Sequence, residues 1–307
     1  TTRTLLAALS ANGKTTTSDL VDAIFRRAGI RTCLVSTLGM KIGALSFPSE
    51  HTTPEAPDLV RFLREALFAR TSHGVIEVSS HALALKRVFG IQFATAVFTN
   101  LTLEHLDFHH DMESYFQAKR LLFSPEGENR VARAVINLDD PYGRRLAAGI
   151  SIPALYYGFD ADADARVTWS QNRADGTDLR VSTPEGEISI HSHLVGRLNT
   201  YNILAATAVG LSLGLEPDVI QRGIESLVGV PGRMELINAG QPFAVVVDYA
   251  HTPDALEKLL ETVRELPHRK IITVFGCGGE RDRAKRSIMG AVAARMSVVS
   301  ASRQPMP

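Results

Sequence analysis

The sequence is poor in cysteine, carries no excess of either charge and contains no long apolar run. Its 307 residues include only Cys33 and Cys277, which are far apart; this excludes a disulfide framework and is typical of a reducing compartment. Lys plus Arg and Asp plus Glu number 33 each, so no long-range field attracts nucleic acid or an anionic membrane. No run approaches the roughly 20 apolar residues of a membrane span, and no signal peptide is recognisable. We therefore expect a protein of the cytoplasm, or of the soluble contents of an organelle, that binds neither nucleic acid nor membrane. We also expect a monomer.

Helical and β-rich patterns alternate along most of the chain, which is 45% hydrophobic. Helices are expected over 15–28, 54–69, 112–123, 199–213 and 217–227, and strands over 32–36, 75–78, 94–99 and 132–137. Strands separated by helices of this length predict an α/β fold, with a P-loop-type, mostly parallel sheet covered by helices on both faces. Ligands of such sheets bind at the carboxyl ends of the strands.

Two changes of pattern suggest how the chain is divided. Short alternating runs over about 152–194 predict a small antiparallel subdomain. Gly229-Val-Pro-Gly232 is a break, which we take as the boundary between a central domain, 1–230, and an incomplete C-terminal domain, 231–307. The second domain is expected to be Rossmann-like, with strands over 243–248 and 270–275 and helices over 253–266 and 282–294.

Asn12-Gly13-Lys14-Thr15 contains the end of a phosphate-binding loop. In such loops backbone N–H groups converge on phosphate oxygens, the lysine neutralises charge and the hydroxyl reaches magnesium. The complete pattern G-x-x-x-x-G-K-[ST] requires glycine at position 8, where this chain has Ala8. Gly-Lys-Thr alone is a weak signal, and an ordinary helix start capped by threonines explains it equally well.

Polar residues follow two of the predicted strands. Glu77 lies at the end of one strand, where a metal-binding acid is useful, although Ser79 or Ser80 in the same stretch can be a simple helix cap. The next strand leads into Thr99-Asn-Leu-Thr-Leu-Glu-His-Leu-Asp-Phe-His109, which holds two acids and two histidines. Magnesium sites are assembled from acids and occasional imidazoles at sheet edges. Lys119, on the following helix, has by itself the pattern of a surface lysine.

Eight ordered motifs nevertheless resemble the Mur ligase family, most closely its members that add the third peptide residue to the peptidoglycan precursor. The resemblance covers nearly the whole chain. The matching stretches are His51–Pro57, Glu77–His81, Thr99–Leu101 with His105–His109, Gln117–Lys119, Gly196–Asn202, Gly229–Glu235, Asp248–Asp254 and Phe275–Arg286.

The resemblance implies an ATP- and Mg²⁺-dependent ligase. ATP would phosphorylate a carboxylate of a UDP-muramoyl dipeptide (UDP-MurNAc-L-Ala-D-Glu), and the amine of a diamino acid would attack the acyl phosphate to form an amide. The resemblance also implies that Lys14 holds the β- and γ-phosphates. Thr15 and Glu77 would bind one magnesium, and His105 would bind a second. Lys119 resembles the family's carbamylated lysine, which supports that metal as an anion and requires a lowered amine pKa.

Other roles are carried over from the same motifs. Catalysis is assigned to Lys14, His105, Lys119 and Arg87, the last as a bidentate clamp for phosphate or carboxylate. Nucleotide contacts are assigned to Asn12, Gly13, Lys14, Thr15, Thr16, Asn202, Arg233, Asp248 and His251. Substrate contacts are assigned to His51, Thr52, Thr53, Ser79, Arg87 and Arg281, of which Arg281 would meet the incoming amino acid.

The sequence also departs from the family pattern. Ala8 and Ser10 stand where glycines are expected; a Cβ in a left-handed backbone costs about 1–2 kcal/mol, so ATP affinity is expected to fall about tenfold per site. We expect the family's uridine-nucleotide-binding domain to be absent before residue 1, and the pattern to stop early after residue 298. Two alternatives stay open: a folylpolyglutamate-type ligase, and a non-catalytic binding or scaffold protein derived from a Mur ligase. The identity of the diamino acid is left open.

Overall fold

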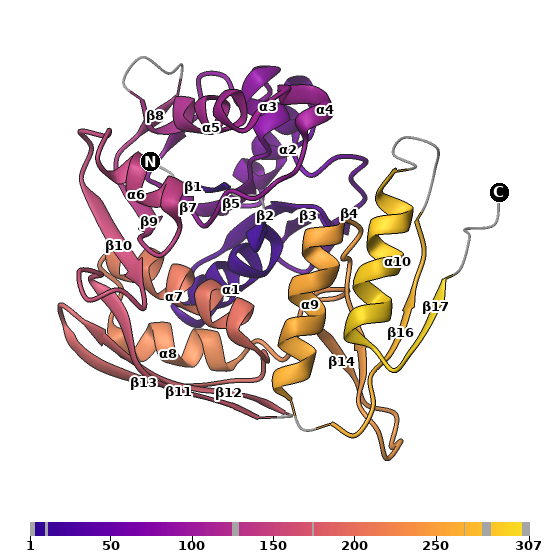
Figure 1. The fold of residues 1–307 in the computed structure, drawn as a ribbon. Helices are drawn as coiled ribbons and strands as arrows, with labels where there is room; N and C mark the ends of the chain where they lie inside the picture. Colours follow the sequence, from indigo (N-terminus) through magenta and orange to yellow (C-terminus); the bar gives the residue numbers. More distant parts are fainter. Residues whose placement is uncertain are drawn as a thin grey trace.

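The computed structural model describes residues 4–9, 12–124, 129–173, 175–266, 268–277 and 284–302. A large central sheet dominates it (Figure 1). Its strands are β1 (Thr4–Leu9), β2 (Thr32–Ser36), β3 (Gly39–Ile42), β4 (Leu45–Phe47), β5 (His73–Glu77), β7 (Thr95–Phe98), β9 (Ala134–Asn137), β10 (Ala154–Gly158), β11 (Ala165–Arg173), β12 (Gly176–Thr183) and β13 (Gly186–Ser192). Their order is β13-β12-β11-β10-β9-β7-β1-β5-β2-β3-β4.

The middle of the sheet is parallel, as predicted. Strands β2, β5, β1, β7, β9 and β10 pair in parallel, so their carboxyl ends lie at one edge. The strand expected over 32–36 is confirmed with those bounds, and those expected over 94–99 and 132–137 are confirmed as shorter strands. Strand β1, the apolar run directly before the phosphate loop, was not predicted. In β1 the partner of Ala8 is Glu77, so the ends of β1 and β5 are neighbours.

The antiparallel region begins later than residue 152. Strand β10 pairs in parallel with β9, whereas β11, β12 and β13 form an antiparallel meander. Because β11 also pairs with β10, the meander continues the central sheet at one side. The hairpin of β3 and β4, which the sequence analysis also missed, extends the other side of the sheet.

Helices cover both faces of the sheet, as expected for a mostly parallel sheet. They are α1 (Lys14–Arg27), α2 (Ala56–Phe68), α3 (Ser80–Ala84), α4 (Leu106–His109), α5 (Met112–Arg120), α6 (Pro141–Ala147), α7 (Arg197–Ser212) and α8 (Pro217–Glu225). In β1, Leu6 belongs to the core formed with α1, α7 and α8, while Ala7 and Leu9 belong to the core formed with α2 and α5. This alternation follows from the period of two along a strand.

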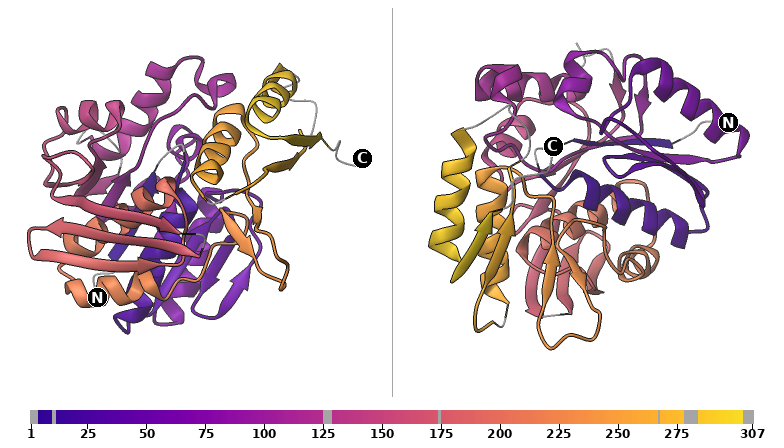
Figure 2. Two further views of the ribbon diagram at one scale, coloured as in Figure 1. Left: turned by 60° about the horizontal axis from the view of Figure 1, so that its bottom comes forward. Right: turned by 90° about the vertical axis from the view of Figure 1, so that its right-hand side faces the viewer.

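Residues beyond 231 form a smaller unit beside the sheet (Figure 2). Its elements are β14 (Glu235–Ile237), β15 (Val245–Val247), α9 (Pro253–Glu265), β16 (Ile272–Phe275), α10 (Ala284–Met296) and β17 (Val299–Ser302). Helices α9 and α10 share a core that includes Leu256, Leu260 and Met289. The strands do not form one sheet in the described residues, because β14 pairs with β15 while β16 pairs with β17.

Two short elements complete the description. Strands β6 (Gln92–Phe93) and β8 (Arg130–Val131) pair in parallel beside the central sheet. The helix expected over 112–123 ends as α5 followed by a 3₁₀ turn over Leu121–Phe123. Among the described residues, no helix has both the length and the apolar character needed to cross a bilayer.

Candidate active site

The phosphate-loop residues lie between the end of β1 and the start of α1. Gly13 precedes the helix with φ 91°, in the left-handed region that favours glycine. A Cβ at Gly13 would also lie 2.3 Å from Oδ1 of Asn202, so a side chain at this position would require the Asn202 side chain to move. The first backbone N–H groups of α1 have no partner within the helix, and a helix N-terminus attracts anions. The geometry therefore suits a phosphate group at Gly13 and Lys14.

The loop is held by residues at the end of β7. The Asn12 backbone N–H donates to Oδ1 of Asn100 at 2.9 Å, and Nδ2 of Asn100 donates back to the Asn12 carbonyl at 2.9 Å. The Thr99 hydroxyl donates to the same carbonyl at 2.8 Å. The Thr99-Asn100 pair is thus a clamp on the loop, a role that the sequence analysis did not assign although it quoted the motif.

Ala8 requires a correction. Glycine was expected at this position for a left-handed backbone, but Ala8 lies inside β1 and is not among the described residues with positive φ. An extended strand accepts a Cβ without strain. Ala8 therefore gives no reason for weaker ATP binding. Ser10 lies outside the described residues.

Glu77 is fully buried at the end of β5, next to the start of α1. The backbone N–H and the hydroxyl of Thr37 each donate to its carboxylate at 3.1 Å, and its carboxylate also hydrogen-bonds to the Thr15 side chain. Burial raises the pKa of Glu77, while the Lys14 ammonium opposes the rise. Burial likewise lowers the pKa of Lys14, against the attraction of Glu104 and Glu77.

The Thr15 and Glu77 oxygens fit a magnesium ion. Mg²⁺ prefers oxygen ligands and commonly takes only one or two from the protein, completing its shell with water and phosphate. Within the described part of the chain, no three His, Cys, Asp or Glu side chains are grouped as a complete metal site. A site that uses Thr15, Glu77 and phosphate oxygens agrees with this finding.

His105 lies at the start of α4 with φ 60°, an uncommon conformation for a residue with a side chain. Its Nε2 lies 3.7 Å from Oε1 of Glu104. Burial lowers the pKa of His105, the Glu104 carboxylate opposes this, and His81 and the Lys14 ammonium lower the pKa further. A neutral imidazole is the form that binds a metal.

Lys119 is buried, which excludes its reading as a surface lysine: its relative exposure is 1%. Among the described residues its Nζ has no hydrogen-bond partner, and it lies 4.9 Å from the centre of the Tyr115 ring. Burial lowers the pKa of Lys119 well below its usual value, and the charge of Lys14 lowers it further. Burial therefore favours the neutral form of the Lys119 amine, and carbamate formation needs the free nitrogen lone pair of that form.

Lys14, Glu77, His105 and Lys119 therefore lie at one edge of the sheet, although they are far apart in the sequence. The charge of Lys14 acts on each of the other three. Parallel strands bring them together because the ends of β1, β5 and β7 share this edge. Arg233 reaches the same place from the C-terminal unit, donating from Nη2 to the Thr15 hydroxyl at 3.2 Å.

The residues assigned to the dipeptide substrate form a second group. The Thr53 hydroxyl donates to the Glu77 carbonyl at 2.8 Å and accepts from the Ser79 backbone N–H at 3.0 Å. Ser79 caps α3 by accepting from Ala82 N at 3.1 Å, so the helix-cap reading of this residue is confirmed. The Thr52 hydroxyl lies 3.0 Å from that of Thr37. His51 is exposed nearby in the chain, and Arg281 lies outside the described residues.

Arg87 is held by two partners in this group. Its Nη2 lies 2.6 Å from Oε1 of Glu55, and its Nη1 donates to the Thr53 carbonyl at 3.1 Å. The Arg87 side chain is 13% exposed and that of Glu55 is 54% exposed. A substrate anion that binds the guanidinium in a bidentate way must therefore displace Glu55, the more exposed partner.

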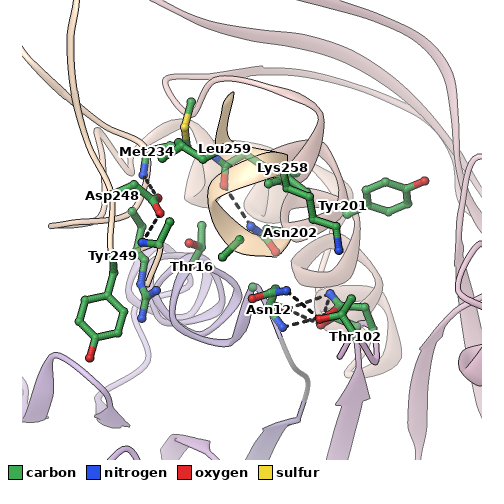
Figure 3. A pocket seen from close by; sticks show the side chains of 18 of the residues that line it. Asn12, Thr16, Thr102, Tyr201, Asn202, Met234, Asp248, Tyr249, Lys258 and Leu259 are labelled. Atoms are coloured by element: carbon green, nitrogen blue, oxygen red, sulfur yellow. Dashed lines mark hydrogen bonds between the residues drawn. The ribbon is translucent and has the colours of Figure 1, made fainter. Parts of the chain in front are cut away.

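A cavity of about 450 Å³ lies beside the phosphate loop, between the central sheet and the C-terminal unit (Figure 3). Asn12, Gly13, Thr16, Asn202, Arg233, Asp248 and His251 line it, together with Asn100, Glu104, Asp139, Asp140, Tyr249 and Lys258, which the sequence analysis did not assign. Asp248 accepts from the backbone N–H groups of Met234 and Ala250, both at 2.8 Å. Arg233 lies over the Tyr249 ring, 4.8 Å from its centre.

A strand, a turn and a helix that carry Gly-Lys-Thr, with a buried acid on the next strand and this cavity, define a P-loop-type nucleotide-binding α/β protein. Residues 11–210 match the family model of the Mur ligase middle domain. Residues 232–303 match that of the Mur ligase glutamate ligase domain. The chain belongs to the Mur ligase family, which depends in general on ATP and Mg²⁺.

Individual relatives agree with this assignment. The chain is 50% identical to UDP-N-acetylmuramoyl-L-alanyl-D-glutamate–2,6-diaminopimelate ligase of Geobacter metallireducens over 294 residues, covering 94% of this chain and 57% of that enzyme. It is 49% identical to the enzyme of the same name from Solibacter usitatus over 286 residues, covering 93% and 58%. The chain thus spans less than two thirds of the length of these curated relatives.

Solved structures show the same fold. A structure of a UDP-N-acetylmuramoyl-L-alanyl-D-glutamate–2,6-diaminopimelate ligase superposes with a TM-score of 0.80 at 30% identity, covering 98% of this chain and 62% of that one. A folylpolyglutamate synthase of Mycobacterium tuberculosis, complexed with ADP and AMPPCP, superposes with a TM-score of 0.72 at 17% identity, covering 98% and 81%. The second likeness concerns the fold alone.

Proposed function

We propose that this chain carries the ATP-binding and catalytic parts of a ligase that joins a diamino acid to UDP-MurNAc-L-Ala-D-Glu. The observation that carries the proposal is the meeting of Lys14, Glu77, His105 and Lys119 at one sheet edge beside a nucleotide-sized cavity. The names of relatives at 49–50% identity favour this substrate over a folate. We propose 2,6-diaminopimelate as the amino acid for the same reason, and a domain boundary near residue 230.

In the proposed reaction the triphosphate lies along the start of α1, with Lys14 on the β- and γ-phosphates. A bound Mg²⁺ would supply charge neutralisation between phosphate and carboxylate, which repel each other at close approach. Thr15 and Glu77 would hold one such ion, and His105 would hold a second. Arg87 would orient the substrate through its phosphate or carboxylate once Glu55 has moved away.

We further propose that Lys119 acts as a carbamate. Its neutral amine forms an N–C bond with carbon dioxide and loses one proton, which turns a buried amine into a buried anion. The anion then faces His105 and the charge of Lys14, so burial of a charge is compensated by opposite charge. The absence of a hydrogen-bond partner for Nζ among the described residues supports this reading.

Phosphate release tests the proposal. The protein, ATP and Mg²⁺ are mixed with UDP-MurNAc-L-Ala-D-Glu and either meso-diaminopimelate or L-lysine. We expect release that needs both the nucleotide dipeptide and one amino acid, loss of release in Lys119→Ala, and partial recovery with a short carboxylic acid. Lys270→Met, an exposed lysine elsewhere, is the control variant.

Two outcomes contradict the proposal. If calorimetry detects no ATP binding, the chain is better explained as a scaffold derived from a Mur ligase. If Lys119→Ala turns over at the wild-type rate, the carbamate is excluded while the ligase itself is retained. A carbonyl signal from ¹³C-bicarbonate in the wild type, absent in Lys119→Ala, measures the carbamate without any turnover.

A further inference from the structure

The ion pair of Glu55 and Arg87 connects the start of α2 with the turn after α3, and the two helices pack in the same core (Figure 1). A Schellman motif fixes the backbone at Arg87, because Arg87 N donates to the Ala82 carbonyl at 2.8 Å. Its second bond runs from Lys86 N to the Leu83 carbonyl at 3.1 Å, and Lys86 has the required left-handed conformation, with φ 57°. The guanidinium therefore extends from a rigid point of the backbone.

The backbone of Glu55 is also fixed, whereas its side chain is not. Glu55 is the N-cap residue of α2, but its carboxylate makes no capping hydrogen bond to that helix. Two residues earlier, the buried Thr53 hydroxyl is bonded to the Glu77 carbonyl and to Ser79 N. Among the described residues, Arg87 is the side-chain partner of the Glu55 carboxylate, which is 54% exposed. The carboxylate can therefore leave Arg87 for water while the backbone stays in place.

The guanidinium edge that faces Glu55 is only half used. Nε and Nη2 lie on this edge and form a fork of two parallel donors, which matches the two oxygens of one carboxylate. Oε1 of Glu55 lies 2.6 Å from Nη2, whereas Nε is buried without a hydrogen-bond partner among the described residues. The remaining nitrogen, Nη1, donates to the Thr53 carbonyl at 3.1 Å. A buried donor without an acceptor is costly, so a group that reaches both Nε and Nη2 binds better than Glu55 does in this arrangement.

We propose that Glu55 is an internal competitor for Arg87 and thereby determines which substrate groups can bind there. An incoming group with two anionic oxygens accepts from both Nε and Nη2, and so gains a hydrogen bond that Glu55 does not make. A neutral amide offers one oxygen and no charge, so it cannot replace Glu55. The inference rests on the proposed function, in which Arg87 orients the UDP-muramoyl dipeptide. A glutamate carboxylate and the diphosphate of UDP share this chemistry, and the experiment separates them.

Calorimetry with the whole chain and Mg²⁺ compares UDP-MurNAc-L-Ala-D-Glu with UDP-MurNAc-L-Ala, which keeps the diphosphate and lacks the glutamate. Glu55→Gln keeps the size of the side chain and removes its charge. We expect it to bind the dipeptide about fivefold more tightly than the wild type, as removal of a competing, partly exposed ion pair allows. Glu65→Gln, which removes an exposed charge near the other end of α2, is the control and should bind as the wild type. A gain for the dipeptide alone assigns the carboxylate as the displacing group, and an equal gain for both ligands assigns the diphosphate.

Arg87→Lys distinguishes competition at the fork from a general effect of charge. Lysine keeps the positive charge but lacks the planar fork, so Glu55→Gln should bring no gain when added to Arg87→Lys. A second measurement uses glutarate, a dicarboxylate without a nucleotide, and ¹⁵N NMR of the arginine Nε–H groups. The Arg87 signal is the one missing in Arg87→Lys. We expect glutarate to shift it at about fivefold lower concentration in Glu55→Gln than in the wild type.

Three results would overturn the inference. Dipeptide binding in Glu55→Gln that is equal to or weaker than that of the wild type rejects competition by Glu55. A gain that persists in the Arg87→Lys background shows that charge alone is responsible, which also rejects it. If neither UDP ligand binds to any variant, the proposed function fails, and the glutarate titration still decides the role of Glu55: equal midpoints in the wild type and Glu55→Gln reject it.

Discussion

At the scale of single residues, burial decides what the candidate side chains can do. Lys119 is 1% exposed and its Nζ has no hydrogen-bond partner among the described residues, so the ammonium form is disfavoured. Nothing in the motif Gln117-Ala-Lys119 reveals this, because a lysine on a helix is usually exposed. The contacts of Arg87 and Thr53 were likewise not expected from the motifs. Arg87 pairs with Glu55, and the Thr53 hydroxyl donates to the Glu77 carbonyl.

The lowered pKa of Lys119 predicts a specific dependence of stability on pH. Above its folded pKa and below the usual 10.5, the folded protein binds fewer protons than the unfolded chain, so wild-type stability rises with pH in this window. At pH 7 and without carbon dioxide, Lys119→Met should be more stable by about 1–3 kcal/mol, because an unpaired amine is removed. The difference should shrink as the pH approaches 10.

Urea unfolding between pH 6 and 10 measures this difference, with Lys270→Met as the exposed control that should show none of it. A Lys119→Met protein that is less stable than the wild type at pH 7 would indicate a partner for the amine. A difference in unfolding free energy that stays constant from pH 6 to 10 would show that the amine does not change its protonation on folding.

At the scale of elements, close helix contacts position the site. Helix α1 carries the phosphate loop at its start and packs on α8 through Gly223, where a Cβ would lie 2.4 Å from Cα of Ile24. This contact is between backbones, so neither helix can yield by a change of rotamer. The sequence predicted both helices, but the reason for a glycine inside the second became visible only from their packing.

We therefore expect Gly223→Ala to destabilise the protein, against the usual effect of this substitution. Alanine improves helix propensity by about 1 kcal/mol, but overpacking against a backbone costs about 1–3 kcal/mol or more. Gly290, inside α10, is a matched control because a Cβ there meets nothing within 4 Å. Thermal unfolding should show a loss for Gly223→Ala and a gain for Gly290→Ala; a gain for both would mean that α1 and α8 are less tightly packed than the structure shows.

Several elements were predicted from the sequence and several were not. The strand over 32–36 and the start of α5 at Met112 follow directly from local patterns. The run before the phosphate loop was missed as a strand although β1 is central, because an apolar run of six residues has no periodicity that separates strand from helix. The β3–β4 hairpin was also missed, although Met40-Lys41-Ile42 and Leu45-Ser46-Phe47 alternate on either side of Gly43.

At the scale of the whole molecule, the cavity is shared between the central sheet and the C-terminal unit. Asn12 and Asn202 line it from one side, and Arg233, Asp248 and Lys258 line it from the other. A small cluster of Val195, Met234 and Leu266 is the apolar contact at this junction. A ligand in the cavity therefore touches both units and stabilises their arrangement.

ATP with Mg²⁺ should consequently protect both units together. We expect slower amide hydrogen exchange in α9 as well as in α1, and an added stability of about 2.7 kcal/mol at a ligand concentration 100 times the Kd. The β12–β13 hairpin, away from the cavity, is an internal control and should exchange as before. Protection confined to α1 would show that the nucleotide binds the phosphate loop without contact to the C-terminal unit.

The sequence by itself determined the alternation of helices and strands, the family and the order of its motifs, because these depend on residues close together in the chain. Only the tertiary structure showed that Lys119 is buried with no hydrogen-bond partner among the described residues and that Arg87 pairs with Glu55. It also showed that Ala8 lies in an extended strand and that Lys258 lines the cavity. Each of these depends on packing between segments distant in sequence. Such neighbours determine the burial of a side chain and the charges around it, and the spacing of residues along the sequence does not reveal them.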